Sequence, residues 1–206
     1  LGIGQGIGLF SWPSKGNNNP LSYSADEATA EASKALLADF IEKFLEHSVD
    51  GSINIISHSM GCRCLMGALE LLAADRISTL AGINQVILAA ADVDAGMMQN
   101  LGRHAVANCT RTTSYVSDKD KALKLSKWLH DFPRVGISPP TFVLDGMDTV
   151  LVNDESLGLV AHGYIGSSRT VLNDVFALLK HNAAPEDRYA IAPVSGGYGN
   201  FWRMKD

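Results

Sequence analysis

The stretch Ile53–Gly61 constrains this chain more than any other, because an apolar run ends abruptly there in Ser-His-Ser-Met-Gly. A helix-forming segment follows, from Met60 to about Ala74. This layout is typical of a nucleophile elbow, a sharp strand-to-helix turn that exposes a serine hydroxyl. Ser57 and Gly61 flank Ser59 and are small, which lets the strand and helix backbones approach closely. We therefore predict that Ser59 is a nucleophile, which needs a base and an orienting acid.

Short apolar runs separated by helix-forming segments predict the fold class. The runs that we predict as strands are Ile53–Ile56, Gln85–Ala91, Arg111–Ser117 and Thr141–Leu144. A capping-box pair, Ser24 and Glu27, marks the start of the first predicted helix. Strands that are apolar rather than alternating are typical of a mostly parallel sheet with helices on both faces. We expect one domain over residues 1–206, with 185–206 as a C-terminal extension.

Composition argues against several classes of protein. The 206 residues are 46% hydrophobic, which suits a compact domain with a sizeable core. With 17 basic and 22 acidic residues the net charge is -5, which argues against a nucleic-acid binder. No apolar run reaches the roughly 18 residues that a membrane-spanning helix needs. The three cysteines form no disulfide framework, and Cys62 and Cys64 lack further ligands at metal-binding spacing, so we predict no metal site.

The base that Ser59 needs is expected beyond the carboxyl ends of the strands, where open α/β sheets bind their ligands. Histidine can take the serine proton and later return it to the leaving group. Only His162 lies in a glycine-flanked loop after the last predicted strand, so we predict it as the base. His58 adjoins the serine, but the tight turn directs it away from Ser59, so we expect it beside the site. The other histidines, on or near predicted helices, are His47, His104, His130 and His181.

The orienting acid is expected among the aspartates that follow predicted strands. Asp120 fits best, because it lies three residues beyond Ser117, where a strand ends and a helix begins. Asp118 is the next candidate, followed by Asp92 or Asp94, and an aspartate at any of these positions also suits a helix N-cap. The order Ser-Asp-His is that of α/β-hydrolases and differs from the order in other serine-hydrolase folds.

The oxyanion hole requires two backbone N–H donors. Met60 supplies one, since it follows the nucleophile at the N-terminus of a predicted helix. The second usually comes from a loop that begins His-Gly after an earlier strand, and no such loop precedes Ser59 in this sequence. Either the segment upstream of Leu1 holds that donor, or the loop with Ser11 and Trp12 lines the pocket instead.

Six stretches together resemble a bacterial α/β-hydrolase family catalogued as domain of unknown function 900. They are Phe10–Gly16, Ile55–Gly61, Val86–Asp94, Ser117–Leu123, Pro133–Gly136 and His162–Ser167. The resemblance implies an α/β-hydrolase fold and a serine hydrolase with Ser59 as nucleophile, Asp120 as acid and His162 as base. The family also places a His-Gly-Phe strand end before the Phe-Ser-Trp-Pro segment. That strand end is absent from this sequence.

These observations predict a carboxylester hydrolase that acts on small-molecule esters, with short acyl groups expected because no lid-like apolar insertion is present. The chemistry needs no cofactor. The alternatives are a catalytically silent α/β-hydrolase that serves as a binding module, and a thioesterase or peptidase with the same triad. The chain begins at Leu1 rather than Met, so we expect its N-terminal strands to be missing. The sequence does not decide between a cytoplasmic and an exported bacterial protein.

Overall fold

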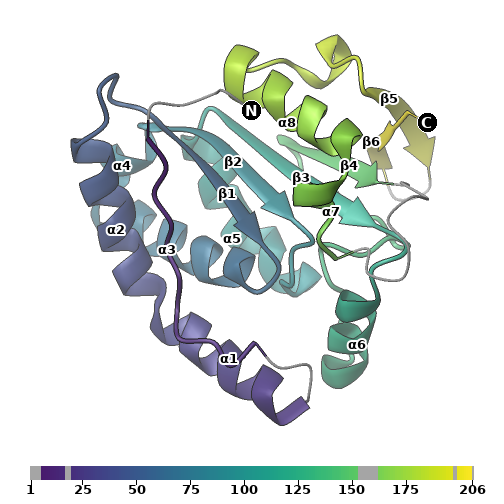
Figure 1. The fold of residues 1–206 in the computed structure, drawn as a ribbon, viewed down its shortest axis with the longest axis horizontal. Helices are drawn as coiled ribbons and strands as arrows, with labels where there is room; N and C mark the ends of the chain where they lie inside the picture. Colours follow the sequence, from purple (N-terminus) through teal and green to yellow (C-terminus); the bar gives the residue numbers. More distant parts are fainter. Residues whose placement is uncertain (1–5, 17–19, 153–161, 197–198, 206) are drawn as a thin grey trace.

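A six-stranded sheet with the strand order β1-β2-β3-β4-β6-β5 forms the centre of the computed structural model, which describes residues 6–16, 20–152, 162–196 and 199–205. Figure 1 shows this sheet between its covering helices. The strands are β1 Ile53–His58, β2 Ile83–Ala89, β3 Arg111–Ser117, β4 Met147–Val152, β5 Ile191–Gly196 and β6 Gly199–Met204. Neighbouring strands from β1 to β4, and β4 with β6, are parallel, and only β5 runs antiparallel to its neighbour. The mostly parallel sheet that we predicted is therefore confirmed.

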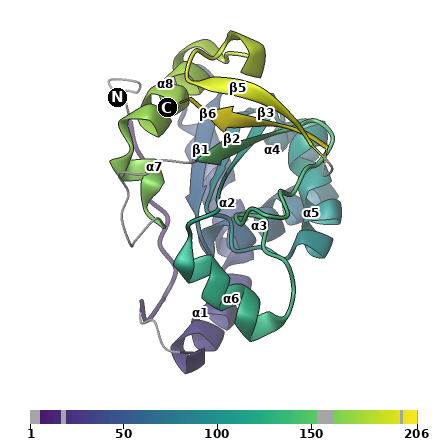
Figure 2. The same cartoon turned by 90° about the vertical axis from the view of Figure 1, so that its right-hand side faces the viewer.

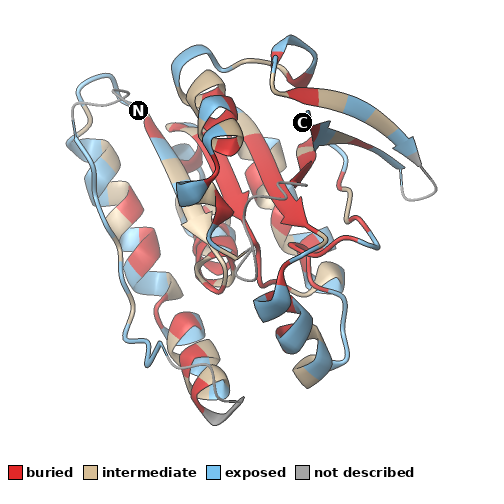
Figure 3. Cartoon of the chain, turned by 45° about the vertical axis from the view of Figure 1, so that its right-hand side comes forward, coloured by how far each residue is buried: buried red, intermediate tan, exposed pale blue. Residues whose placement is uncertain are grey.

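Helices cover both faces of the sheet. Alternate side chains of a strand point to opposite sides, so an apolar strand such as β2 contributes to a core on each face. Val86 and Leu88 of β2 pack in one core with the helices α2, α3 and α5. Ile87 and Ala89 pack in a second core with α8. The helices of these two layers are α2 Lys34–Glu46, α3 Gly61–Asp75, α4 Ile77–Leu80, α5 Ala95–Asn108, α7 Tyr164–Ser167 and α8 Arg169–His181, and the short 3-10 turn η2 Pro185–Asp187 follows. Figure 3 shows that the central strands are the most completely buried part of the molecule.

Two helices, α1 Pro20–Ala32 and α6 Lys121–His130, lie beyond the carboxyl ends of the strands (Figures 1 and 2). Their side chains meet, since the hydroxyl of Tyr23 on α1 lies 2.8 Å from Ser126 Oγ on α6. Both hydroxyl groups also bond the carboxylate of Asp92, which follows β2. These contacts join α1 and α6 to the end of the sheet where ligands of such folds bind. None of the helices in the described ranges is long and apolar enough to cross a membrane.

The fourth strand lies later in the chain than we predicted. Residues 141–144, predicted as a strand, have no regular structure, and β4 begins at Met147 instead. Pro139 and Pro140 precede this segment and lack the N–H groups that a strand within a sheet would donate. The Asp145-Gly146 pair, which directly follows the predicted strand, forms the turn that enters β4, with Gly146 at φ 81°.

The first helix also differs from our prediction. We predicted a start at the Ser24–Glu27 capping box, but α1 begins at Pro20, and a second helix, α2, follows it. The break falls at Ser33, whose hydroxyl donates to the carbonyl oxygen of Thr29 at 2.7 Å. A serine that bonds the preceding turn in this way bends a helix.

The residues after Pro185, expected as an extension, contribute two strands to the sheet. β5 and β6 form an antiparallel hairpin with Val194 opposite Phe201. β6 then pairs with β4, where Val150 is opposite Trp202. The tail therefore lengthens the sheet at the edge opposite β1.

Candidate active site

Ser59 occupies a tight turn between β1 and α3. Its φ is 54°, a left-handed conformation that is strained for a residue with a side chain. The end of β2 holds this conformation, because Ser59 N–H donates to the carbonyl oxygen of Ala89 at 2.9 Å and Ser59 O accepts from Asp92 N–H at 3.1 Å. On the far side of the turn, a Cβ added to Gly61 would lie 3.3 Å from both Ser57 Oγ and the Trp12 ring. The need for small residues around the serine, which we predicted, is visible in these approaches.

Ser59, His162 and Asp120 are joined by two hydrogen bonds. Ser59 Oγ lies 2.8 Å from His162 Nε2, and His162 Nδ1 lies 2.8 Å from Asp120 Oδ2. An ionised carboxylate only accepts hydrogen bonds, so the proton of the neutral imidazole belongs on Nδ1. Nε2 is then free to accept from the serine hydroxyl. The geometry suits proton transfer from Ser59 to His162.

Asp120 is fully buried and uses its two carboxylate oxygens for different partners. Oδ2 faces His162, and Oδ1 accepts from the backbone N–H of Leu123 at 3.0 Å. The second bond makes Asp120 the N-cap of α6, at the point where β3 has just ended. The two interpretations that the sequence offered for this residue, catalytic acid and helix cap, are therefore compatible in one side chain.

His58 packs beside His162 and not toward Ser59, as its place in the turn suggests. Its Nε2 lies 2.7 Å from the backbone carbonyl oxygen of His162, and the two rings meet edge-on with centroids 4.7 Å apart. Burial lowers the pKa of His58, and the hydrogen bond to the His162 carbonyl group opposes that shift only in part. A neutral His58 with a proton on Nε2 donates to that carbonyl group.

Tyr164 holds the other side of the His162 loop, and sequence reasoning gave it no role. This fully buried hydroxyl accepts from Ala90 N–H and donates to the carbonyl oxygen of Tyr115, both at 2.7 Å. Ala90 directly follows β2, and Tyr115 lies within β3 opposite Ala89. The position of Tyr164 two residues after His162, in the stretch that carries the family resemblance, was the only signal in the sequence. Part of the loop that we predicted ahead of His162, residues 153–161, lies outside the described residues.

The other aspartates that we considered have different partners. Asp94 caps α5 by accepting from Met97 N–H at 2.9 Å. Asp92 is buried and accepts from Tyr23 Oη at 2.5 Å and from Ser126 Oγ at 2.7 Å. Burial and the Asp92 carboxylate raise the pKa of Tyr23 to about 12, so that hydroxyl stays a donor. Asp118 is partly exposed beside the end of β3.

The remaining histidines are not gathered at Ser59. His130 Nε2 lies 3.1 Å from Glu27 Oε2, which links α6 to α1. His104 is partly exposed on α5, and His47 and His181 are exposed at the ends of α2 and α8.

The pocket residues that we predicted lie on both sides of the turn. Met60 is the N-cap of α3, so its N–H has no acceptor within the helix itself. The Trp12 ring packs against Gly61, while Ser11 is exposed. The positive end of the α3 dipole and the Met60 N–H group favour a developing negative charge at Ser59.

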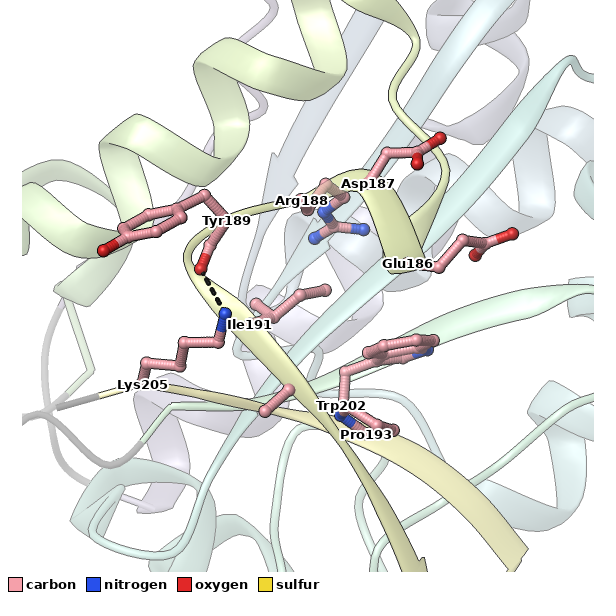
Figure 4. Close-up of a pocket in the computed structure, with 9 residues that line it drawn as sticks. Glu186, Asp187, Arg188, Tyr189, Ile191, Pro193, Trp202 and Lys205 are labelled. Carbon is pink, nitrogen blue, oxygen red and sulfur yellow. Dashed lines mark hydrogen bonds between the residues drawn. The ribbon is translucent and has the colours of Figure 1, made fainter.

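A separate open pocket of about 500 Å³ lies at the opposite edge of the sheet, around β5 and β6 (Figure 4). Two of its charged side chains already have partners. Arg188 Nε donates to Asp174 Oδ1 at 2.9 Å, and Lys205 Nζ donates to the carbonyl oxygen of Tyr189 at 2.7 Å. This pocket lacks the serine and histidine that we predict for catalysis.

Comparison with known proteins gives the chain a family. No curated protein and no solved structure was found to match it. A family model described as an alpha/beta hydrolase of unknown function (DUF900) matches residues 5–143. The match includes Ser59 and Asp120 and ends before His162, and the mostly parallel sheet with helices on both faces agrees with it. The chain therefore belongs to the DUF900 family of alpha/beta hydrolases.

Proposed function

We propose that this protein is a serine hydrolase that cleaves carboxylic esters through an acyl-enzyme on Ser59. The observation that carries the proposal is the chain of two 2.8 Å contacts from Ser59 through His162 to Asp120. A serine hydroxyl becomes a useful nucleophile when a base can take its proton and an acid holds that base in the right tautomer.

The reaction that we propose has two halves. Ser59 Oγ attacks the ester carbonyl carbon while its proton passes to His162 Nε2, and Asp120 stabilises the imidazolium that forms. The N–H of Met60 donates to the oxyanion. His162 then gives the proton to the departing alkoxide, which leaves as an alcohol. In the second half, water attacks the acyl carbon while His162 takes its proton. The bond to Ser59 Oγ then breaks, the proton returns to the serine, and the carboxylic acid is released.

Hydrolysis of p-nitrophenyl acetate and butyrate by the wild type and Ser59→Ala tests the proposal. We expect the variant to lose at least about 10³-fold in kcat/KM, since removing a triad nucleophile leaves only binding and oxyanion stabilisation. Ser78→Ala is the matched control, because Ser78 is an exposed serine on α4. Equal rates for the wild type and Ser59→Ala would refute the proposal.

A fluorophosphonate probe separates an active serine from a silent binding module. Such probes react only with an activated serine. We expect Ser59 to be labelled in the wild type and labelling to be lost in His162→Ala. Labelling without ester turnover would redirect the search to thioester or peptide bonds, and failure to label would favour a binding role.

A further inference from the structure

The helix α6 exposes large apolar side chains that a surface helix ordinarily buries. Leu123 and Ser126 face the core at 1% exposure each. On the outer side, Leu125 is 43% and Trp128 is 76% exposed. An amphipathic surface helix normally turns its apolar stripe inward. The outer stripe of α6 is therefore left without a protein partner among the described residues.

Neighbouring segments extend this stripe into a patch. Phe132, just after α6, is 60% exposed, and Met97 at the start of α5 is 47% exposed. The two segments are adjacent, because Ala95 N–H donates to the carbonyl oxygen of Pro133 at 2.9 Å. The α6 patch is defined here as Met97, Leu125, Trp128 and Phe132. A cluster of exposed apolar side chains of this kind marks an interaction surface.

Lysines accompany the α6 patch. Lys121, Lys124 and Lys127 lie on α6, and the helix contains no acidic residue from Lys121 to His130. The first two are exposed and the third is partly exposed. This local positive charge contrasts with the net charge of -5 for the chain. Lysines beside an exposed tryptophan and leucine are the composition of helices that lie in the headgroup region of an anionic bilayer.

The same charges disfavour a second copy of this chain as the occupant. A two-fold interface brings the same patch of both copies together, so the lysines of one α6 would face those of the other. Like charges across an interface repel, whereas an anionic lipid surface pairs with them.

The patch lies at the end of the molecule that carries the predicted catalytic residues. The helix begins at Asp120, which contacts His162, and it lies beyond the carboxyl ends of the strands (Figure 2). Figure 3 shows its outer side exposed below the sheet. We propose that the α6 patch docks on an anionic lipid surface.

Vesicle co-sedimentation tests the docking in a Ser59→Ala background, in which the proposed turnover cannot consume the lipid. The full chain is mixed with vesicles of phosphatidylcholine containing phosphatidylglycerol, and with vesicles of phosphatidylcholine alone. We expect binding to the anionic vesicles that weakens with added salt, because screening reduces the attraction of the lysines. Trp128→Glu and the double variant Lys121→Glu/Lys124→Glu should each bind the anionic vesicles at least about tenfold more weakly.

Ile77→Glu is the matched control, since Ile77 is 60% exposed on α4, next to the start of β2. It should bind vesicles like its parent, and circular dichroism must show that all variants are folded. Binding unaffected by the α6 changes, or no binding to anionic vesicles, would overturn the inference. So would a dimer that Trp128→Glu dissociates, because a second copy would then cover the patch. Vesicle binding without p-nitrophenyl ester hydrolysis in the wild type would refute the proposed function and leave the docking surface standing.

Discussion

The Nε2 atom of His58 lies 2.7 Å from the backbone carbonyl oxygen of His162. The residue before the predicted nucleophile thus bonds the backbone of the predicted base, which comes from a loop more than a hundred positions later in the chain. Together with Tyr164 on the other side, this contact fixes the position of the imidazole over Ser59. We therefore predict that His58 is a positioning residue.

Replacing His58 should impair turnover by displacing His162. We expect His58→Ala to lose roughly 10- to 100-fold in kcat, since small displacements of a catalytic group have effects of this order. His58→Gln retains an amide donor near the position of Nε2 and should recover most of that loss. The measurement is kcat and KM on p-nitrophenyl butyrate, with KM nearly unchanged. Equal losses in the alanine and glutamine variants would argue against a role through this hydrogen bond.

The partly buried His58 should also make stability depend on pH. Its pKa is lowered in the folded state, chiefly by burial, so the unfolded chain binds this proton first as the pH falls. The contribution to stability is complete above the unfolded pKa of about 6.5 and is lost as the pH falls through the folded pKa. We expect the urea midpoint of the wild type to fall below about pH 6.5 and that of His58→Gln to fall less. Parallel declines would contradict this prediction.

Asp120 should show separable effects on activity and on stability. Asp120→Asn retains an oxygen that caps α6 but loses the charge that stabilises the imidazolium, so kcat should fall by about 10⁴-fold with little loss of stability. Asp120→Ala should lose similar activity and also about 1 kcal/mol of unfolding free energy. Asp94→Ala removes the corresponding cap of α5 and is the matched control. It should be destabilised by a similar amount and keep its kcat.

The cysteines should take no part in the chemistry, although Cys62 lies one helical turn from Ser59. Burial raises the pKa of Cys62 and Cys109 to about 12 and that of Cys64 to about 11. The thiolate is the reactive form, so the native thiols should resist iodoacetamide at pH about 8 and react after denaturation. Mass spectrometry reads the labelling, and ester hydrolysis should be unchanged by the reagent. Inactivation in step with labelling of Cys62 would contradict this prediction.

Local sequence was sufficient for the elements that have a clear signal of their own. The runs Ile53–Ile56 and Gln85–Ala91 are mostly apolar, and each leads into a turn and a helix, so β1, β2 and α3 were predicted within a few residues. The placement of β4 required more, because two short apolar runs compete on either side of Asp145-Gly146. Pairing with β3 selects the later run, and that partner is remote in sequence. The position of β6 between β4 and β5 depends on pairing in the same way.

In the candidate site, too, some features could be predicted from the sequence and others depend on remote contacts. The order of Ser59, Asp120 and His162 along the chain pointed to three side chains that the structure brings within hydrogen-bonding distance, while their catalytic roles stay predictions. The contacts of His58 and Tyr164 could not be found in this way. Their partners are backbone groups, the carbonyl oxygens of His162 and Tyr115 and the N–H of Ala90, and every residue in a sequence offers such groups.

The left-handed backbone at Ser59 has a consequence for how this position would change under selection for stability alone. A glycine adopts that conformation without the strain of order 1 kcal/mol that a side chain adds there. Ser59→Gly should therefore relax the turn, and selection for folding stability alone would favour glycine at this position. The serine is a local weakness of the fold, and such trade-offs between stability and activity are a property of working sites.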